Sequence, residues 1–89
     1  MSTIIVFETS SRQRELKRTL YLLGYKDRVV IQQCNLLYLP NFTLYHETNT
    51  PETCKNDVVA ICKRLGIDLQ RCIAAVFDGG SVICGEECE

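Results

Sequence analysis

The stretch Thr3-Ile4-Ile5-Val6-Phe7 leads directly into Glu8, and this junction decides the fold. Every residue from Ile4 to Phe7 is apolar, and a strand without polar alternation is typical of one that is covered on both faces. We therefore expect a central strand here. Glu8 is the first charged residue of the chain, so any chemistry at the end of this strand is expected to begin there.

A helix is predicted to follow the strand, and it carries four of the ten Lys and Arg residues. Ser10 with Gln13 three residues later matches a capping box, and Ser11 is an equally good N-cap. Gly24 is expected to end the helix, because glycine tolerates the left-handed conformation best.

The two sides of this helix differ in composition. Leucines recur at helical spacing on the side expected to face the core, namely Leu16, Leu20 and Leu23. The other side gathers Arg14, Lys17, Arg18 and Tyr21. Together with Arg12 these cations could contact phosphates, with Tyr21 or Tyr25 as a stacking ring. The simpler interpretation is a solvated charged helix face.

Length and composition predict one globular domain over residues 1–89, with 46% apolar and 24% charged residues. No stretch approaches the roughly 18 continuous apolar residues of a membrane span. Met1-Ser2-Thr3 has no basic segment of the kind that opens a signal peptide, which favours the cytoplasm.

The charge is small but unevenly distributed. The net charge of −1 is not that of a dedicated nucleic-acid-binding domain, which is more often strongly basic. Residues 1–45 nevertheless carry six Lys or Arg against three acids, whereas residues 46–89 carry four against eight. This asymmetry suits either one basic face or the pairing of opposite patches between two copies.

The six cysteines are expected to be reduced thiols in a cytoplasmic chain. Cys54 and Cys62 are eight residues apart on one predicted helix, about 12 Å along its axis, which is too far for a disulfide. Both are interpreted as small core residues. Cys84 and Cys88 with His46 could ligate zinc, but neither C-x-x-C nor a second pair at finger spacing is present.

The middle of the chain is predicted to form one long hairpin. A strand running from Val29 to Leu39 turns at Pro40-Asn41 and returns over residues 42–47, where apolar and polar residues alternate. The tip is unusually apolar and is expected to be a subunit interface, formed by Leu36, Leu37, Tyr38, Leu39 and Phe42.

A second helix is predicted between Thr50 as N-cap and Gly66, with Pro51 at its first position. Its buried stripe is expected to comprise Cys54, Val58, Ile61, Cys62 and Leu65. A strand over 72–77, a turn at Asp78-Gly79-Gly80-Ser81 and a short strand over 82–84 complete the chain.

This order, βαββαβ with a short C-terminal strand, predicts an α+β fold of the ferredoxin-like, split-βαβ type. Its antiparallel sheet carries both helices on one face, with the first and third strands central. We expect the other face to be covered in a homodimer, or the last strand to pair edge to edge.

The first third of the chain contains Val6-Phe7-Glu8-Thr9-Ser10-Ser11-Arg12-Gln13-Arg14-Glu15-Leu16-Lys17-Arg18, then Leu20, Leu23-Gly24-Tyr25 and Arg28-Val29-Val30. This run resembles the opening of the small CRISPR-associated endoribonuclease family. Leu39-Pro40-Asn41 is similar to a turn of the GhoS-type antitoxin ribonucleases. The resemblance implies a homodimer, RNA or DNA as partner, and a carboxylate pair with Mg²⁺ at the dimer axis. Glu8 stands where the CRISPR-associated family has an aspartate.

Two candidate catalytic residues follow, each with a simpler interpretation. Glu8 could hold Mg²⁺ with its mate across a dimer, or it could be a solvated carboxylate near a helix N-terminus. His46 could act as a general acid or base, or it could be a hydrogen-bonded structural histidine.

Two functions are therefore compatible with the sequence. The first is a nucleic-acid-interacting dimer, with metal-dependent endoribonuclease or antitoxin-type RNA activity. The alternative is a non-catalytic protein-interaction module, regulatory or of the phage-inhibitor type, that binds a protein through the hairpin tip or the acidic C-terminal half. Salt dependence of binding separates them, because phosphate contacts weaken steeply with salt.

Overall fold

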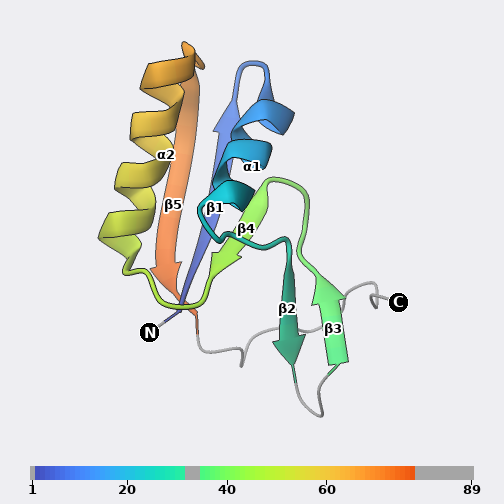
Figure 1. Cartoon of the computed structure of the whole chain (residues 1–89). Coiled ribbons are helices and arrows are strands. Elements are labelled where there is room, and N and C mark those ends of the chain that lie inside the picture. The colour runs from blue at the N-terminus through green and yellow to red at the C-terminus, as the bar shows by residue number, and fades with distance from the viewer. Residues whose placement is uncertain (1, 32–34, 78–89) are drawn as a thin grey trace.

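The computed structural model describes residues 2–31 and 35–77 and shows a mixed α+β fold (Figure 1). Its elements are β1 (Thr3–Thr9), α1 (Gln13–Leu22), β2 (Arg28–Ile31), β3 (Asn35–Tyr38), β4 (Thr43–His46), α2 (Pro51–Leu65) and β5 (Leu69–Val76). Within this part of the chain, no helix is long and apolar enough to cross a membrane.

The main sheet has three strands in the order β4-β1-β5, and β1 is antiparallel to both neighbours. β2 and β3 form a separate two-stranded antiparallel ladder. One isolated bridge joins the chain before β2 to β4, with Lys26 and Tyr45 exchanging two backbone hydrogen bonds of 2.8 Å. This arrangement is compatible with a ferredoxin-like plan, in which the second strand lies beside the third.

Both helices cover one face of this sheet, and the core lies between the two layers (Figure 1). Side chains alternate along β1, so that Ile5 and Phe7 are buried while Val6 is 46% exposed. Among the described residues, the helices cover one face of this strand, and coverage of the other face by a second subunit stays a prediction. A run of apolar residues shows that a strand is hydrophobic, but it does not show which layers cover the strand. Here both helices lie on one side of the sheet.

The predicted long hairpin is wrong. β2 pairs antiparallel with β3 in a register that runs from Arg28 opposite Tyr38 to Ile31 opposite Asn35. The turn at Pro40 exists, with the Thr43 N–H donating to the Pro40 carbonyl at 3.1 Å, but it links β3 to β4 of the other sheet. The third predicted strand, β4, is an edge strand of the three-stranded sheet, and the Lys26–Tyr45 bridge lies along its other side.

The first helix begins later than its cap signals predict. Arg12, in the left-handed region at φ 60°, is the N-cap residue and provides no side-chain cap. Ser10 instead donates its backbone N–H to the Asp68 carbonyl at 3.1 Å, which keeps it in register with the chain entering β5. Leu16 and Leu20 are buried as predicted, but Leu23 follows the last helical residue and is 48% exposed.

The second helix confirms its predicted ends. The Thr50 hydroxyl accepts a hydrogen bond from the Thr53 N–H at 3.2 Å, Pro51 occupies the first position, and Gly66 ends the helix at φ 70°. The predicted stripe is buried at four positions, Cys54, Val58, Ile61 and Cys62, while Leu65 is partly buried. The predicted turn and strand over 78–84, as well as Cys84 and Cys88, lie outside the described residues.

Candidate functional site

The exposed side of α1 presents a row of cations that leads to a tyrosine. Arg14 and Tyr21 lie seven residues apart, which is about 10 Å along a helix axis, with Lys17 and Arg18 between them. Arg14 and Lys17 form no hydrogen bond or ion pair with any residue that the structure describes. This side of α1 therefore carries positive charge that the described part of the chain leaves available to a ligand.

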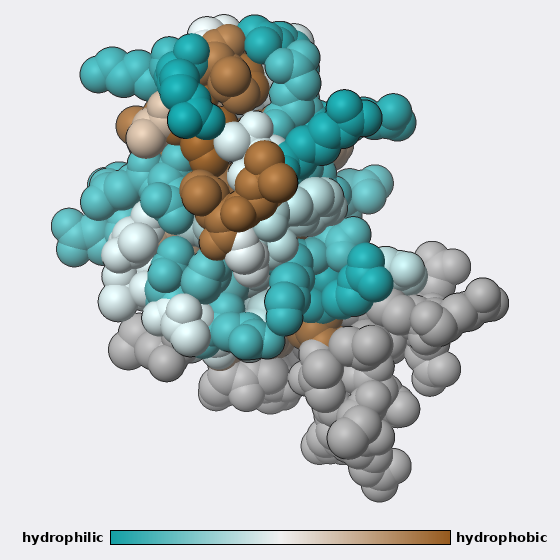
Figure 2. Space-filling view, in the orientation of Figure 1, coloured by the Kyte–Doolittle hydropathy of each residue, from teal (hydrophilic) through white to brown (hydrophobic). Residues whose placement is uncertain are grey.

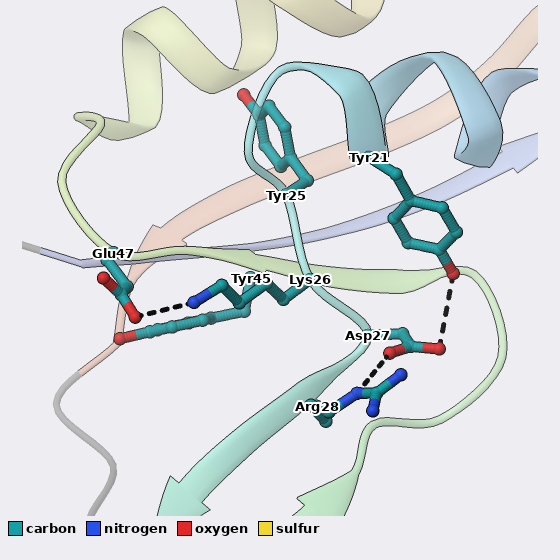
Figure 3. Close-up of a pocket in the computed structure, with 7 residues that line it drawn as sticks. All are labelled: Tyr21, Tyr25, Lys26, Asp27, Arg28, Tyr45 and Glu47. Carbon is teal, nitrogen blue, oxygen red and sulfur yellow. Dashed lines mark hydrogen bonds and ion pairs between the residues drawn. The ribbon is translucent and has the colours of Figure 1, made fainter.

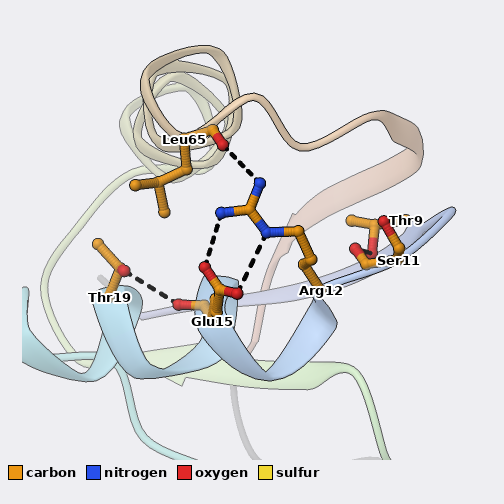
Figure 4. A network of polar contacts seen from close by, with 6 residues as sticks. All are labelled: Thr9, Ser11, Arg12, Glu15, Thr19 and Leu65. Atoms are coloured by element: carbon orange, nitrogen blue, oxygen red, sulfur yellow. Dashed lines mark hydrogen bonds and ion pairs between the residues drawn. The ribbon is translucent and has the colours of Figure 1, made fainter.

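Arg12 does not belong to this row, because its guanidinium ties the start of α1 to the end of α2 (Figure 4). It donates to the Glu15 carboxylate at 3.1 and 2.7 Å, and to the Leu65 carbonyl at 2.8 Å. The hydrogen bonds from Arg12 lower the pKa of Glu15. The candidate phosphate ligands are thus Arg14, Lys17 and Arg18.

A cavity of about 530 Å³ opens where the chain leaves α1 (Figure 3). Seven residues line it, three of which are tyrosines: Tyr21, Tyr25, Lys26, Asp27, Arg28, Tyr45 and Glu47. The Lys26–Tyr45 bridge positions the chain after α1 against β4, which brings the two groups of lining residues together. The cavity therefore joins Tyr21 of the α1 row to residues that lie more than 20 positions away.

Ion pairs organise the polar lining of the cavity. Lys26 contacts Glu47 at 3.0 Å, and Arg28 contacts Asp27 at 3.0 Å. The Tyr21 hydroxyl donates to the other Asp27 oxygen at 3.4 Å, and partial burial, followed by this carboxylate, raises the pKa of Tyr21. Because two cations face two carboxylates, the formal charges of the lining cancel.

Tyr25 anchors this region to α2. It is 3% exposed, and its hydroxyl donates to an Asp57 carboxylate oxygen at 2.9 Å. Burial first, and then hydrogen bonding to Cys54 and Asp57, raises the pKa of Tyr25, so the phenol stays neutral. Tyr25 therefore ties the chain beside the cavity to α2, and its buried ring is not available for stacking.

His46 uses both ring nitrogens in backbone hydrogen bonds. Nδ1 accepts from the N–H groups of Thr48 and Asn49 at 3.2 and 3.1 Å. Nε2 lies 3.2 Å from the Leu23 carbonyl, to which it must donate. The edge-to-face contact with Tyr25, with ring centroids 4.8 Å apart, completes this environment. The geometry agrees with a structural histidine, and the catalytic role stays a prediction.

Glu8 lies on the sheet face that the helices leave open, beside Arg71 at 3.8 Å. His46 pairs with Thr3 at the other end of β1, about 17 Å away at strand spacing, on the covered face. The two predicted catalytic residues are therefore not brought together.

Among the described residues, Glu8 has a positive neighbour and belongs to no group of metal ligands. No group of three His, Cys, Asp or Glu side chains with metal-binding spacing occurs among the described residues. Arg71 is a positive neighbour that competes with a cation for the carboxylate. Mg²⁺ binding by Glu8 stays a prediction that depends on a second copy.

The five predicted interface residues do not share a hairpin tip. Tyr38 belongs to β3 and is 41% exposed, with the Arg28 guanidinium 5.2 Å from its ring centre. Phe42 follows the turn at φ 66° and packs against Phe7, with ring centroids 6.5 Å apart. Leu39 donates its backbone N–H to the Asp27 carbonyl at 2.8 Å. The side chains of Leu36 and Leu37 lie outside the described part of the chain.

Sequence reasoning missed most of the cavity, including Lys26, Asp27, Arg28 and Glu47. The signal available was the charged triplet Lys26-Asp27-Arg28 directly after a Gly-Tyr turn, which is easily interpreted as a solvated connection. The alternation over residues 42–47 places Tyr45 and Glu47 on one side of a strand, and no local pattern links them to Tyr21.

The chain was compared with protein-family models, curated proteins and solved structures, and none of them gave a significant match.

Proposed function

We propose that this protein binds nucleic acid as a ferredoxin-like domain, holding phosphates on Arg14, Lys17 and Arg18. The observation that carries the proposal is the row of these cations on one exposed side of α1, ending at Tyr21 and its cavity. Arg14 and Lys17 have no competing carboxylate among the described residues, since Glu15 is engaged by Arg12. Three of the six Lys and Arg residues in the first half of the chain are thereby gathered on one surface, although the net charge is −1.

Phosphate binding by these residues has a measurable signature. A protein that neutralises phosphates releases condensed counterions, and for single strands the logarithm of affinity falls with the logarithm of salt at about −0.7 per contact. Three contacts therefore predict a slope of about −2.

The test is fluorescence anisotropy of a labelled single-stranded RNA over a range of NaCl concentrations. We compare the wild type with Arg14→Gln/Lys17→Gln/Arg18→Gln and with a matched control, Lys55→Gln/Lys63→Gln/Arg64→Gln. Both variants remove three exposed or half-buried cations, but the control lies on α2. The α1 variant should lose most of its affinity and salt slope. Equal losses in the two variants would show that only net charge matters and would reject the site.

We further propose that the protein forms a homodimer and acts as a Mg²⁺-dependent endoribonuclease. Val6 and Ile73, which face each other across β1 and β5 on the open face, are 46% and 68% exposed. A second copy covering this face would also bring a second Glu8 to it. RNA cleavage with Mg²⁺ should then occur in the wild type and be absent in Glu8→Gln. Cleavage that survives this substitution would remove Glu8 from the proposal.

One observation on the surface of the helix layer favours the alternative function, a non-catalytic protein-interaction module. Apolar residues interrupt the hydrophilic surface of the helix layer (Figure 2). Leu22 is 86% exposed, and with Leu23, Ala60 and Ile61 it lines a groove between α1 and α2. Binding that persists at high salt and is lost in Leu22→Ala would favour a protein partner at this groove.

A further inference from the structure

We propose that the cavity beside Tyr21 accepts one unpaired base of the bound strand, which makes the protein selective for single-stranded nucleic acid. This inference rests on the proposed function, because the cations of α1 must first hold the backbone of that strand.

The position of the cavity supports this assignment. Tyr21 lies seven residues after Arg14 on the same side of α1, so a strand held by the cations reaches the cavity without leaving this side. The Tyr21 side chain projects from α1 toward Asp27 at the mouth of the cavity (Figure 3). Its residue exposure of 39% leaves ring surface open to a ligand.

The charges that line the cavity favour a neutral base over a phosphate. The cations of the cavity, Lys26 and Arg28, are each paired with a carboxylate at 3.0 Å. A phosphate entering here would meet Asp27 and Glu47 as well as these cations, and it is better held on α1. A nucleobase is neutral, and its edge carries both donors and acceptors that such a lining can match.

The size and aromatic content of the cavity also fit a base. About 530 Å³ lies within the range of small-molecule pockets. The Tyr21 ring, on a residue that is 39% exposed, offers a stacking surface of the kind on which single-stranded bases are bound in a sequence-tolerant way. In a duplex each base is stacked and paired, and extruding it costs a few kcal/mol, so duplexes should bind less well.

The experiment uses two single-stranded oligonucleotides with the same number of phosphates, one with bases and one composed of abasic sites, together with a duplex of the same sequence. Affinities are measured for the wild type, Tyr21→Ala and Val59→Ala. Val59 is the control, because it is an exposed apolar residue of α2, at 43%, and lines neither the cavity nor the groove between the helices.

We expect the wild type and Val59→Ala to bind the base-containing strand about tenfold more tightly than the abasic strand and the duplex. Tyr21→Ala should bind base-containing and abasic strands almost equally while keeping the salt slope of the wild type. The chain has no tryptophan, so quenching of tyrosine fluorescence by the base-containing strand alone gives an independent readout.

The outcomes separate this inference from the proposed function. Salt-dependent binding with no preference for bases, or a preference unchanged in Tyr21→Ala, would overturn the base site and leave the phosphate row intact. Absence of salt-dependent binding to either strand would overturn both.

Discussion

At the start of α1, two arginines two residues apart have different roles. Arg12 is held by Glu15 and by the Leu65 carbonyl, whereas Arg14 contacts neither. The spacing of charges along the helix does not reveal this difference, because the Leu65 carbonyl comes from an element 53 residues away. At the residue scale, the partner decides whether a cation is available to a ligand.

This pair predicts a pH dependence at Glu15. Its pKa is lowered in the folded state by the Arg12 hydrogen bonds, so the contribution of the pair to stability is present above the ordinary carboxyl pKa. That contribution is lost as the pH falls through the lowered, folded-state pKa. A ¹³C NMR titration should find Glu15 protonating at lower pH in the folded protein than in urea. In Arg12→Gln the two titrations should converge, and an unchanged folded-state titration would contradict the assignment.

At the scale of elements, the segment between α1 and β2 is fixed by close approach to β4. Gly24 adopts φ 94°, and a Cβ built on it would lie 3.3 Å from His46 Nε2. His46 in turn receives backbone hydrogen bonds from the residues that lead into α2. The end of α1, β4 and the start of α2 therefore meet at one histidine.

Gly24→Ala should destabilise the protein more than Gly66→Ala. Both glycines have positive φ, which costs an L-residue about 1–2 kcal/mol, but a Cβ at Gly66 meets no atom within 4 Å. The free energy of unfolding of each variant is measured by urea denaturation. The difference between Gly24→Ala and Gly66→Ala isolates the contact with His46. In a double-mutant cycle, His46→Ala should reduce the excess cost of Gly24→Ala. Equal costs at the two glycines would show that the contact is not limiting.

At the scale of the whole molecule, two thiols report on the integrity of the core. Cys54 and Cys62 are 0% and 4% exposed between α2 and the sheet, and burial raises the pKa of both thiols. The thiolate is the reactive form, so both cysteines should alkylate far more slowly in the folded protein than in urea. A brief iodoacetamide pulse followed by peptide mass spectrometry measures this protection. Labelling of Cys54 at the unfolded rate would contradict the packing of α2.

Local chemistry made much of this fold predictable. Thr50, Pro51 and Gly66 define α2 because caps act over three or four residues, and the leucines of α1 mark its buried side at two of three positions. The α+β class followed from the order of the elements. The row of Arg14, Lys17, Arg18 and Tyr21 was likewise predictable, because helical spacing alone places these residues on one side.

The sequence by itself determined the helices, the central position of β1 and the basic side of α1. Only the tertiary structure decided that β4 pairs with β1 and not with the strand before it, which face of β1 the helices leave open and that Arg12 is already occupied. It also assembled the cavity, by pairing Lys26 with Tyr45 across 19 positions of sequence. Each of these features depends on contacts between segments distant along the chain, to which periodicity and capping signals do not extend.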